Sequence, residues 1–248
     1  MRAFFRPADK EDVVTVASVH PGVCRPRGFR RALIATAGMA SWLVAFAVPA
    51  FADCGDAIEG ERVACHCGDV VVADVRLQPG DPVVIDRCPA DGLLVRVPAQ
   101  SRSVVVDLNG QEIRGSGVGT GIRILSGGSE GAEIVGGVGG VAGVVSGFGE
   151  GIRSTRPDDL RLLTNVVVRD SRDTGVVLRG NRAALESVRV EGNGGDGLRT
   201  SGRSVDLIGV EAEDNGERGL RDRSRAGERD VTSQRNRVSD AGRGRGTQ

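Results

Sequence analysis

Apolar and polar residues alternate in short runs over residues 92–232, and the runs recur at a nearly constant interval. In steps of 22 residues, Val176 corresponds to Leu198 and Leu185 to Leu207. Such alternation predicts β-strands that bury one face. Helical spacing is not sustained after residue 53, and frequent glycine disfavours helices. We therefore expect an all-β fold.

Each repeat opens on a glycine followed by an apolar residue. The repeats begin at Gly92, Gly121, Gly151, Gly175, Gly197 and Gly219, so the intervals are 29, 30, 24, 22 and 22 residues. A repeat of this length, built from strands and turns, predicts a solenoid. Its coils would stack about 4.8 Å apart around an interior of Leu, Ile and Val.

The turns repeat as regularly as the strands. Asn193 and Asn215 occupy equivalent places, and Ser171 takes the same place one coil earlier. Glycines in these turns would supply positive φ, and stacked asparagine amides could form a ladder. We interpret four further residues as turn formers: Asp170, Asp173, Asp196 and Asp214.

Three stretches, residues 67–77, 88–93 and 106–110 with Ile113, resemble exported bacterial right-handed parallel β-helix proteins of the pectate-lyase-like fold. The likeness covers about residues 54–232 and shows no clear catalytic set. It implies a single right-handed parallel β-helix of about six coils. That fold carries lyases, hydrolases, epimerases and non-catalytic adhesins, so the resemblance implies the fold and not an activity.

The N-terminus has the three parts of an export signal. Arginines at 25–31 precede an apolar run at 32–48, and Ala50-Phe51-Ala52 forms a cleavage signature. A membrane anchor is the alternative, but the run ends in a cleavage site. We expect an extension and signal peptide at 1–52, a cysteine-rich cap at 53–91, the β-helix at 92–232 and a disordered tail at 233–248. The mature protein would be secreted, periplasmic or at the cell surface, with no membrane segment.

Four cysteines lie close together after the cleavage site: Cys54, Cys65, Cys67 and Cys88. An even number in an exported chain indicates disulfides, for which three pairings exist. Because Cys65 and Cys67 are too close to favour each other, we favour Cys54–Cys65 with Cys67–Cys88. A metal site that includes His66 is the alternative, but the C-x-x-C spacing is missing.

Composition limits the possible functions. Residues 53–248 hold 26 basic and 30 acidic residues, which argues against nucleic acid as the main partner. They contain no tyrosine, one aromatic residue, Phe148, and one histidine, His66. The resemblance implies a Tyr/His pair for an epimerase and carboxylates with a histidine for a hydrolase, and both sets are incomplete. Few aromatic residues also leave no stacking platform for neutral sugars.

Asp158 and Asp159 are the one pair of adjacent aspartates in the mature chain, and they follow Pro157 in an insertion within their coil. They could bind Ca²⁺ or act as acid and base. A solvated turn is the alternative, because no third ligand or histidine is nearby. We therefore lean towards a protein without catalysis or cofactor, with a polysaccharide lyase or glycoside hydrolase as the alternative.

One row of basic residues suggests a ligand. The row contains Arg123, Arg153, Arg199 and Arg221, each two residues after an opening glycine, and Val177 interrupts it. Alternation points these side chains outwards, and stacked like charges invite an anionic partner. Alternatively, Glu191, Glu211 or Glu213 neutralises the row. The expected function is that of an exported interaction protein that binds an acidic polysaccharide or cell-surface component.

The repeat degrades after Leu220, and no capping helix is evident in the sequence that follows. A bare final coil would present unpaired strand edges. We therefore also expect weak self-association through the C-terminal coil.

Overall fold

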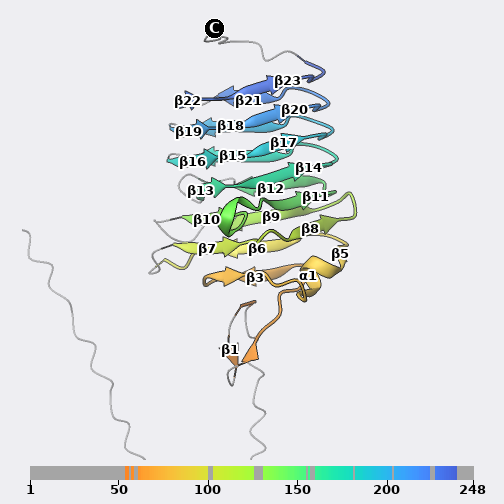
Figure 1. Ribbon diagram of the computed structural model, residues 1–248, viewed down its shortest axis with the longest axis vertical. Helices are drawn as coiled ribbons and strands as arrows, with labels where there is room; N and C mark the ends of the chain where they lie inside the picture. The colour runs from red at the N-terminus through yellow and green to blue at the C-terminus, as the bar shows by residue number, and fades with distance from the viewer. Residues whose placement is uncertain are drawn as a thin grey trace, which may run out of the picture. The chain divides into compact units, whose positions relative to one another are not determined.

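The repeats form three parallel β-sheets that run the length of a solenoid, as a computed structural model shows (Figure 1). The structure describes residues 54–55, 57–58, 61–99, 103–125, 131–154, 156, 160–180, 182–202, 204–223 and 227–238. Within them, each sheet has seven strands. The six expected coils are present, and the cysteine-rich segment adds one further strand to each sheet, below them.

Each coil contributes one strand to each sheet in turn. The first sheet consists of β3 (Asp69–Val71), β6 (Leu93–Arg96), β9 (Thr120–Leu125), β12 (Glu150–Ser154), β15 (Val176–Gly180), β18 (Leu198–Gly202) and β21 (Leu220–Arg223). The second consists of β4 (Val75–Arg76), β7 (Val104–Asp107), β10 (Ala132–Val135), β13 (Leu160–Thr164), β16 (Ala183–Glu186), β19 (Val205–Ile208) and β22 (Gly227–Arg229). The third consists of β5 (Arg87–Cys88), β8 (Glu112–Gly115), β11 (Gly143–Ser146), β14 (Val166–Arg169), β17 (Arg189–Glu191), β20 (Glu211–Glu213) and β23 (Thr232–Gln234).

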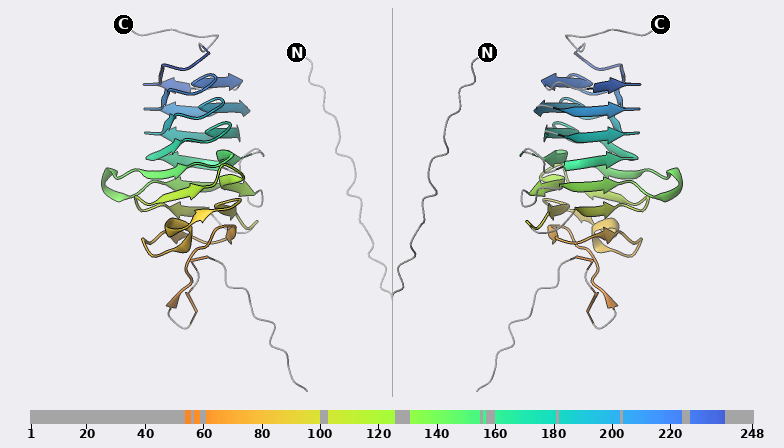
Figure 2. Two further views of the ribbon diagram at one scale, coloured as in Figure 1. Left: turned by 90° about the vertical axis from the view of Figure 1, so that its right-hand side faces the viewer. Right: turned by 90° about the vertical axis from the view of Figure 1, so that its left-hand side faces the viewer.

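The register confirms the predicted interior columns. Val176 pairs with Leu198, which pairs with Leu220, and Leu185 pairs with Leu207. All of these except Leu220 are fully buried, and the side views show the coils stacked one above another (Figure 2). The interior is therefore a set of aliphatic columns, each built from one residue per coil.

The opening glycines are needed because successive coils approach closely. A Cβ at Gly175 would lie 2.7 Å from the carbonyl oxygen of Gly197, and a Cβ at Gly197 would lie 2.7 Å from that of Gly219. Our sequence-based explanation, positive φ in the turns at 193–197 and 215–219, was wrong, because none of their glycines has a positive φ. The requirement is for space, not for a left-handed backbone.

Left-handed residues instead flank the strands of the third sheet. Asn165 and Asp170 enclose β14 with φ of 53° and 55°, and Gly209 and Asp214 enclose β20 with φ of 60° and 52°. Asparagine, aspartate and glycine tolerate this region best. The interpretation of Asp170 and Asp214 as turn formers is thus confirmed.

A buried ladder of asparagines connects the upper coils. The Asn193 Nδ2 donates to Asn215 Oδ1 at 2.9 Å, and the Asn215 Nδ2 donates to Asn236 Oδ1 at 3.0 Å. Each Oδ1 also accepts from a backbone N–H one coil below, as Asn193 Oδ1 does from Ser171 N at 3.0 Å. The predicted ladder is confirmed, and Asn236 extends it by one coil.

The cap has the two disulfides that the sequence analysis favoured, Cys54–Cys65 and Cys67–Cys88. Cys67 precedes β3 and Cys88 ends β5. The second disulfide therefore closes the coil of the cap, which consists of β3, β4 and β5, into a covalent ring. Because all four thiols are used, the alternative metal site with His66 has no cysteine ligands left. The cap also contains the antiparallel pair β1 (Ala57–Ile58) and β2 (Glu61–Arg62), and the helix α1 (Pro82–Ile85).

An ion pair between the exposed Arg62 and the buried Asp81 supports this cap. Arg62 donates through Nη1 and Nη2 to the Asp81 carboxylate at 2.7 and 2.8 Å, and the Gln78 backbone N donates at 2.9 Å. Burial by itself raises the pKa of Asp81, but these hydrogen bonds and the Arg62 charge outweigh it and hold the pKa below its ordinary value.

At the other end, the last coil replaces inward apolar residues by polar ones. Asp222 pairs in register with Thr200, whose hydroxyl donates to its carboxylate, and Ser233 pairs with Ala212. Terminal repeats of solenoids commonly become polar in this way. Self-association through the edges of β21–β23 stays a prediction.

Asn193→Ala should lower the free energy of unfolding by about 2 kcal/mol, because it deletes three hydrogen bonds and leaves the buried Ser171 N–H without its acceptor. Urea unfolding followed by circular dichroism measures this. Gln234→Ala, which removes an exposed amide, should change it by less than about 0.5 kcal/mol. Equal effects of the two substitutions would contradict a stabilising ladder.

Asp81→Asn should lower the free energy of unfolding by about 2 kcal/mol at neutral pH. Because the folded-state pKa of Asp81 is lowered, its contribution is present above the unfolded-state value of about 3.9 and is lost as pH falls through the folded value. Melting temperatures of both proteins between pH 7 and pH 2 should therefore converge towards acid. For Asp206→Asn, at an exposed position, the melting temperature should stay close to that of the wild type over the whole pH range.

Candidate functional site

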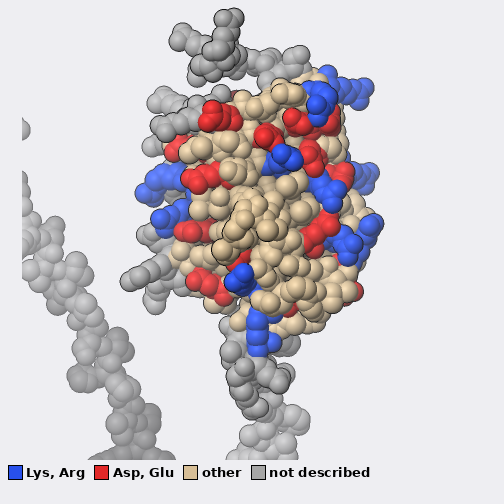
Figure 3. Space-filling model, viewed as in Figure 1, with Lys and Arg blue, Asp and Glu red and all other residues tan. Residues whose placement is uncertain are grey.

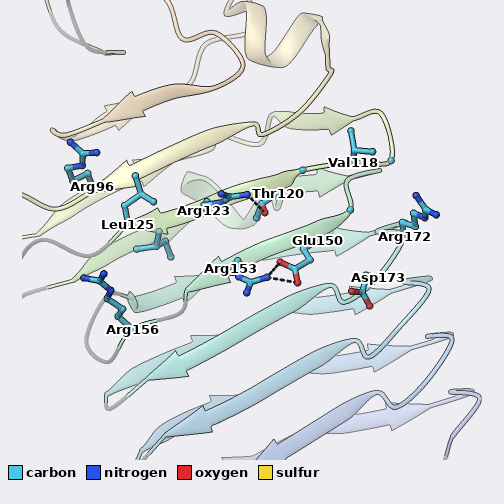
Figure 4. A pocket seen from close by; sticks show the side chains of 14 residues that line it. Arg96, Val118, Thr120, Arg123, Leu125, Glu150, Arg153, Arg156, Arg172 and Asp173 are labelled. Carbon is cyan, nitrogen blue, oxygen red and sulfur yellow. Dashed lines mark hydrogen bonds and ion pairs between the residues drawn. The ribbon is translucent and has the colours of Figure 1, made fainter.

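A groove of about 1210 Å³ lies on the outer face of the first sheet, over β6, β9 and β12 (Figure 4). Its lining includes five arginines, Arg96, Arg123, Arg153, Arg156 and Arg172, and two acidic residues, Glu150 and Asp173. Arginine and carboxylate charges therefore do not balance in the lining, and the groove favours an anionic ligand.

The strand register builds the floor of this groove. Arg123 pairs with Arg153 across β9 and β12, and Arg199 pairs with Arg221 across β18 and β21. Val177 lies between the two pairs. The structure thus places the four predicted arginines in one outward column, interrupted where the sequence indicated.

Every arginine of this column is held by a carboxylate. Arg153 Nη1 contacts the two Glu150 oxygens at 2.6 and 2.8 Å, and Arg123 Nη2 lies 3.0 Å from Asp91 Oδ1. Asp196 Oδ2 accepts from Arg199 at 3.0 Å and lies 3.5 Å from Arg221 Nη1. The carboxylates come from the turns or strand starts at which each repeat opens, so they form a column of acidic residues beside the arginines.

The acids that we expected to neutralise the row were the wrong ones. Glu191, Glu211 and Glu213 belong to the third sheet, where Glu211 binds Arg189 at 2.7 Å and Glu213 binds Arg235 at 2.8 Å. The Glu211 carboxylate raises the pKa of Arg189. On the face shown in Figure 3, basic and acidic side chains likewise lie beside one another.

Asp196 is more than the turn former that we expected. Its side chain is fully buried, and besides the two arginines it accepts from the Arg218 backbone N at 3.3 Å. A buried carboxylate needs such partners, because removing a charge from water is costly. Asp196 therefore joins the starts of two successive strands, β18 and β21.

A second outward column was missed by the sequence analysis. Arg96 pairs with Leu125, and Ser201 lies between Arg179 and Arg223. These arginines are exposed, and among the residues that the structure describes they have no carboxylate partner. Alternation could have identified the column, because Arg96, Arg179 and Arg223 each lie two residues after a position in register with the first column: Leu94, Val177 and Arg221.

Figure 4 shows how the groove is divided. Arg96 and Arg156 lie on the side where the strands end, whereas Arg172 and Asp173 lie on the side of the preceding turns. The Glu150–Arg153 pair lies between them. The strand-end side of the groove therefore carries two of the five lining arginines and neither of the two lining acids.

The predicted catalytic pair Asp158 and Asp159 lies outside the described residues, so its role stays a prediction. Among the residues that are described, no group of three potential metal ligands occurs. His66 lies in the cap, 3.6 Å from Asp69, and does not line the groove. What the described lining can do chemically is bind anions.

Comparisons with protein-family models, curated proteins and solved structures found no match to this chain. In the part of the chain that the structure describes, no helix is long and apolar enough to cross a membrane.

Asp196→Asn should lower the free energy of unfolding by about 2 kcal/mol, because a charged acceptor of several hydrogen bonds becomes neutral. Asp173→Asn, at an exposed turn position, should change it by less than about 0.5 kcal/mol. Guanidinium unfolding of both variants compares them. A neutral outcome for Asp196→Asn would mean that this carboxylate does not hold the coils together.

Proposed function

We propose that this protein is an exported parallel β-helix protein that binds an acidic polysaccharide along the outer face of its first sheet. The observation that carries the proposal is the charge of this face. The described positions of its two outward columns include seven arginines and no carboxylate: Arg96, Arg123, Arg153, Arg179, Arg199, Arg221 and Arg223. Three of them have no carboxylate partner in the described part of the chain.

The spacing of these three favours an elongated ligand. Arg96, Arg179 and Arg223 lie on β6, β15 and β21, which are three and two coils apart in the sheet. At about 4.8 Å per coil, the separations along the stack are about 14 and 10 Å. A single small anion spans neither distance, whereas a linear polymer lying along the solenoid spans both.

Recognition would depend on charge and on aliphatic contacts. The mature chain has one aromatic residue, Phe148, and it is fully buried, so it offers no stacking surface for sugar rings. Val118 and Leu125 line the groove beside the arginines and offer apolar surface to the C–H faces of a sugar. These features favour an acidic polysaccharide over a neutral one.

The cap supports the proposed compartment. Two disulfides persist only in oxidising surroundings, which agrees with an exported protein. Acidic polysaccharides are abundant outside cells, so the proposed ligand and the proposed location are compatible.

Arg96→Gln/Arg179→Gln should weaken binding of an acidic polysaccharide by about tenfold, because it removes two charge-assisted contacts. Hyaluronan and polygalacturonate immobilised on a sensor surface are suitable probes, with dextran as the neutral reference. The matched control, Arg87→Gln/Arg114→Gln, removes two exposed arginines paired in register on the third sheet and should change affinity by less than about twofold.

Equal losses for the two double variants, or no binding by the wild type, would contradict the proposal. Shortening of the polysaccharide that is abolished by Asp159→Ala would instead support the alternative of a polysaccharide lyase or hydrolase.

A further inference from the structure

Glu150 differs from the other two carboxylates that hold the first arginine column. Asp91 Oδ1 also accepts from the Thr120 backbone N at 2.7 Å, and Asp196 also accepts from the Arg218 backbone N. Both therefore support the main chain. In the part of the chain that is described, the Glu150 side chain is bonded to Arg153 alone. Its position in the groove is thus not required to hold the backbone.

The Glu150–Arg153 pair lies in the floor of the groove and is open to a ligand. The side chains are 19% and 41% exposed, and Nη1 of Arg153 contacts both carboxylate oxygens (Figure 4). A ligand anion that approaches Arg153 would have to replace an acceptor already in place. It would also come close to the Glu150 charge, which repels it.

We propose that Glu150 determines the ligand specificity of this groove by occupying Arg153 in place of a ligand anion. This inference rests on the proposed function. Acidic polysaccharides are then bound through the arginines of the second column alone: Arg96, Arg179 and Arg223. A polymer with one carboxylate on every second sugar fits that arrangement. A polymer with a carboxylate on every sugar must bring some of them against Glu150 and is disfavoured.

Asp173 provides a matched comparison. It lines the same groove, and its carboxylate has no arginine partner among the described residues. Asp173→Asn and Glu150→Gln raise the charge of the groove by the same amount, but only the second releases an arginine. A difference between them therefore separates the release of Arg153 from the general effect of charge.

The experiment measures affinity for hyaluronan, which has one carboxylate per two sugars, and for polygalacturonate, which has one per sugar. The proteins are the wild type, Glu150→Gln, Asp173→Asn, Arg153→Gln and the Glu150→Gln/Arg153→Gln double variant. Thermal melts check that each is folded. The wild type should prefer hyaluronan.

Glu150→Gln should bind polygalacturonate about fivefold more tightly, since it gains one charge-assisted contact, and its binding should weaken more steeply with salt. Asp173→Asn should change the affinity by less than about twofold, and Arg153→Gln should show no gain in affinity. The double variant should lose the gain. This pattern would establish that Glu150 acts through Arg153.

Three outcomes would overturn the inference: no gain in Glu150→Gln, an equal gain in Asp173→Asn, or a gain that survives in the double variant. Failure of the proposed function has a different signature, because the wild type would then bind neither polymer. In that case, Arg153-dependent binding by Glu150→Gln would still support the blocking role of Glu150, and its absence would overturn that role too.

Discussion

The in-register stacking of one coil on the next is the constraint on which the rest of this structure depends. Parallel pairing places each residue beside its counterpart in the neighbouring coil, about 4.8 Å away. At the opening of each repeat the approach is so close that only glycine fits, as Gly175 and Gly197 show. Any side chain at these positions would separate the coils and interrupt the columns that follow.

Stacking also brings residues of the same type together at equivalent positions of successive coils. In the interior it aligns aliphatic residues, and at Asn193 and Asn215 it aligns amides that bond one another. On the outer face it aligns arginines, and like charges at this distance repel. The column of Asp91, Glu150 and Asp196 offsets that repulsion, because each carboxylate lies within reach of an arginine. The face therefore keeps its arginines without losing the register of the stack.

The sequence predicts those features that repeat with the period of the coil. The interior columns, the asparagine ladder and the row from Arg123 to Arg221 could each be found by aligning residues at equivalent positions. The two disulfides could also be favoured, because the cysteines are few and close together. The solenoid fold could thus be predicted from this one sequence.

The carboxylates that bind these arginines were not predicted in the same way. Which acid reaches Arg123 depends on how the coils stack, because Asp91 lies in the coil below, and the unequal intervals of 29, 30 and 24 residues in the lower coils conceal that pairing. Glu150 and Asp196 each lie only three residues before their arginines and could have been found by proximity along the sequence. The acids suggested instead, Glu191, Glu211 and Glu213, lie on the third sheet. The burial of the Asp196 carboxylate depends on arginines from two successive coils. The residues of the turn that contains Asp196 therefore do not indicate this burial by themselves.

The turns of the upper coils have a consequence for the chemical lifetime of the protein. Asn193-Gly194 and Asn215-Gly216 are dipeptides that deamidate readily, because the glycine nitrogen can attack the asparagine side chain to form a cyclic imide. Here Gly194 N donates to Ser171 O at 2.8 Å and Gly216 N donates to Asn193 O at 2.7 Å. Both nitrogens keep their protons engaged and point away from the amide that they would attack. The bonds that join the coils therefore also protect the asparagines against deamidation.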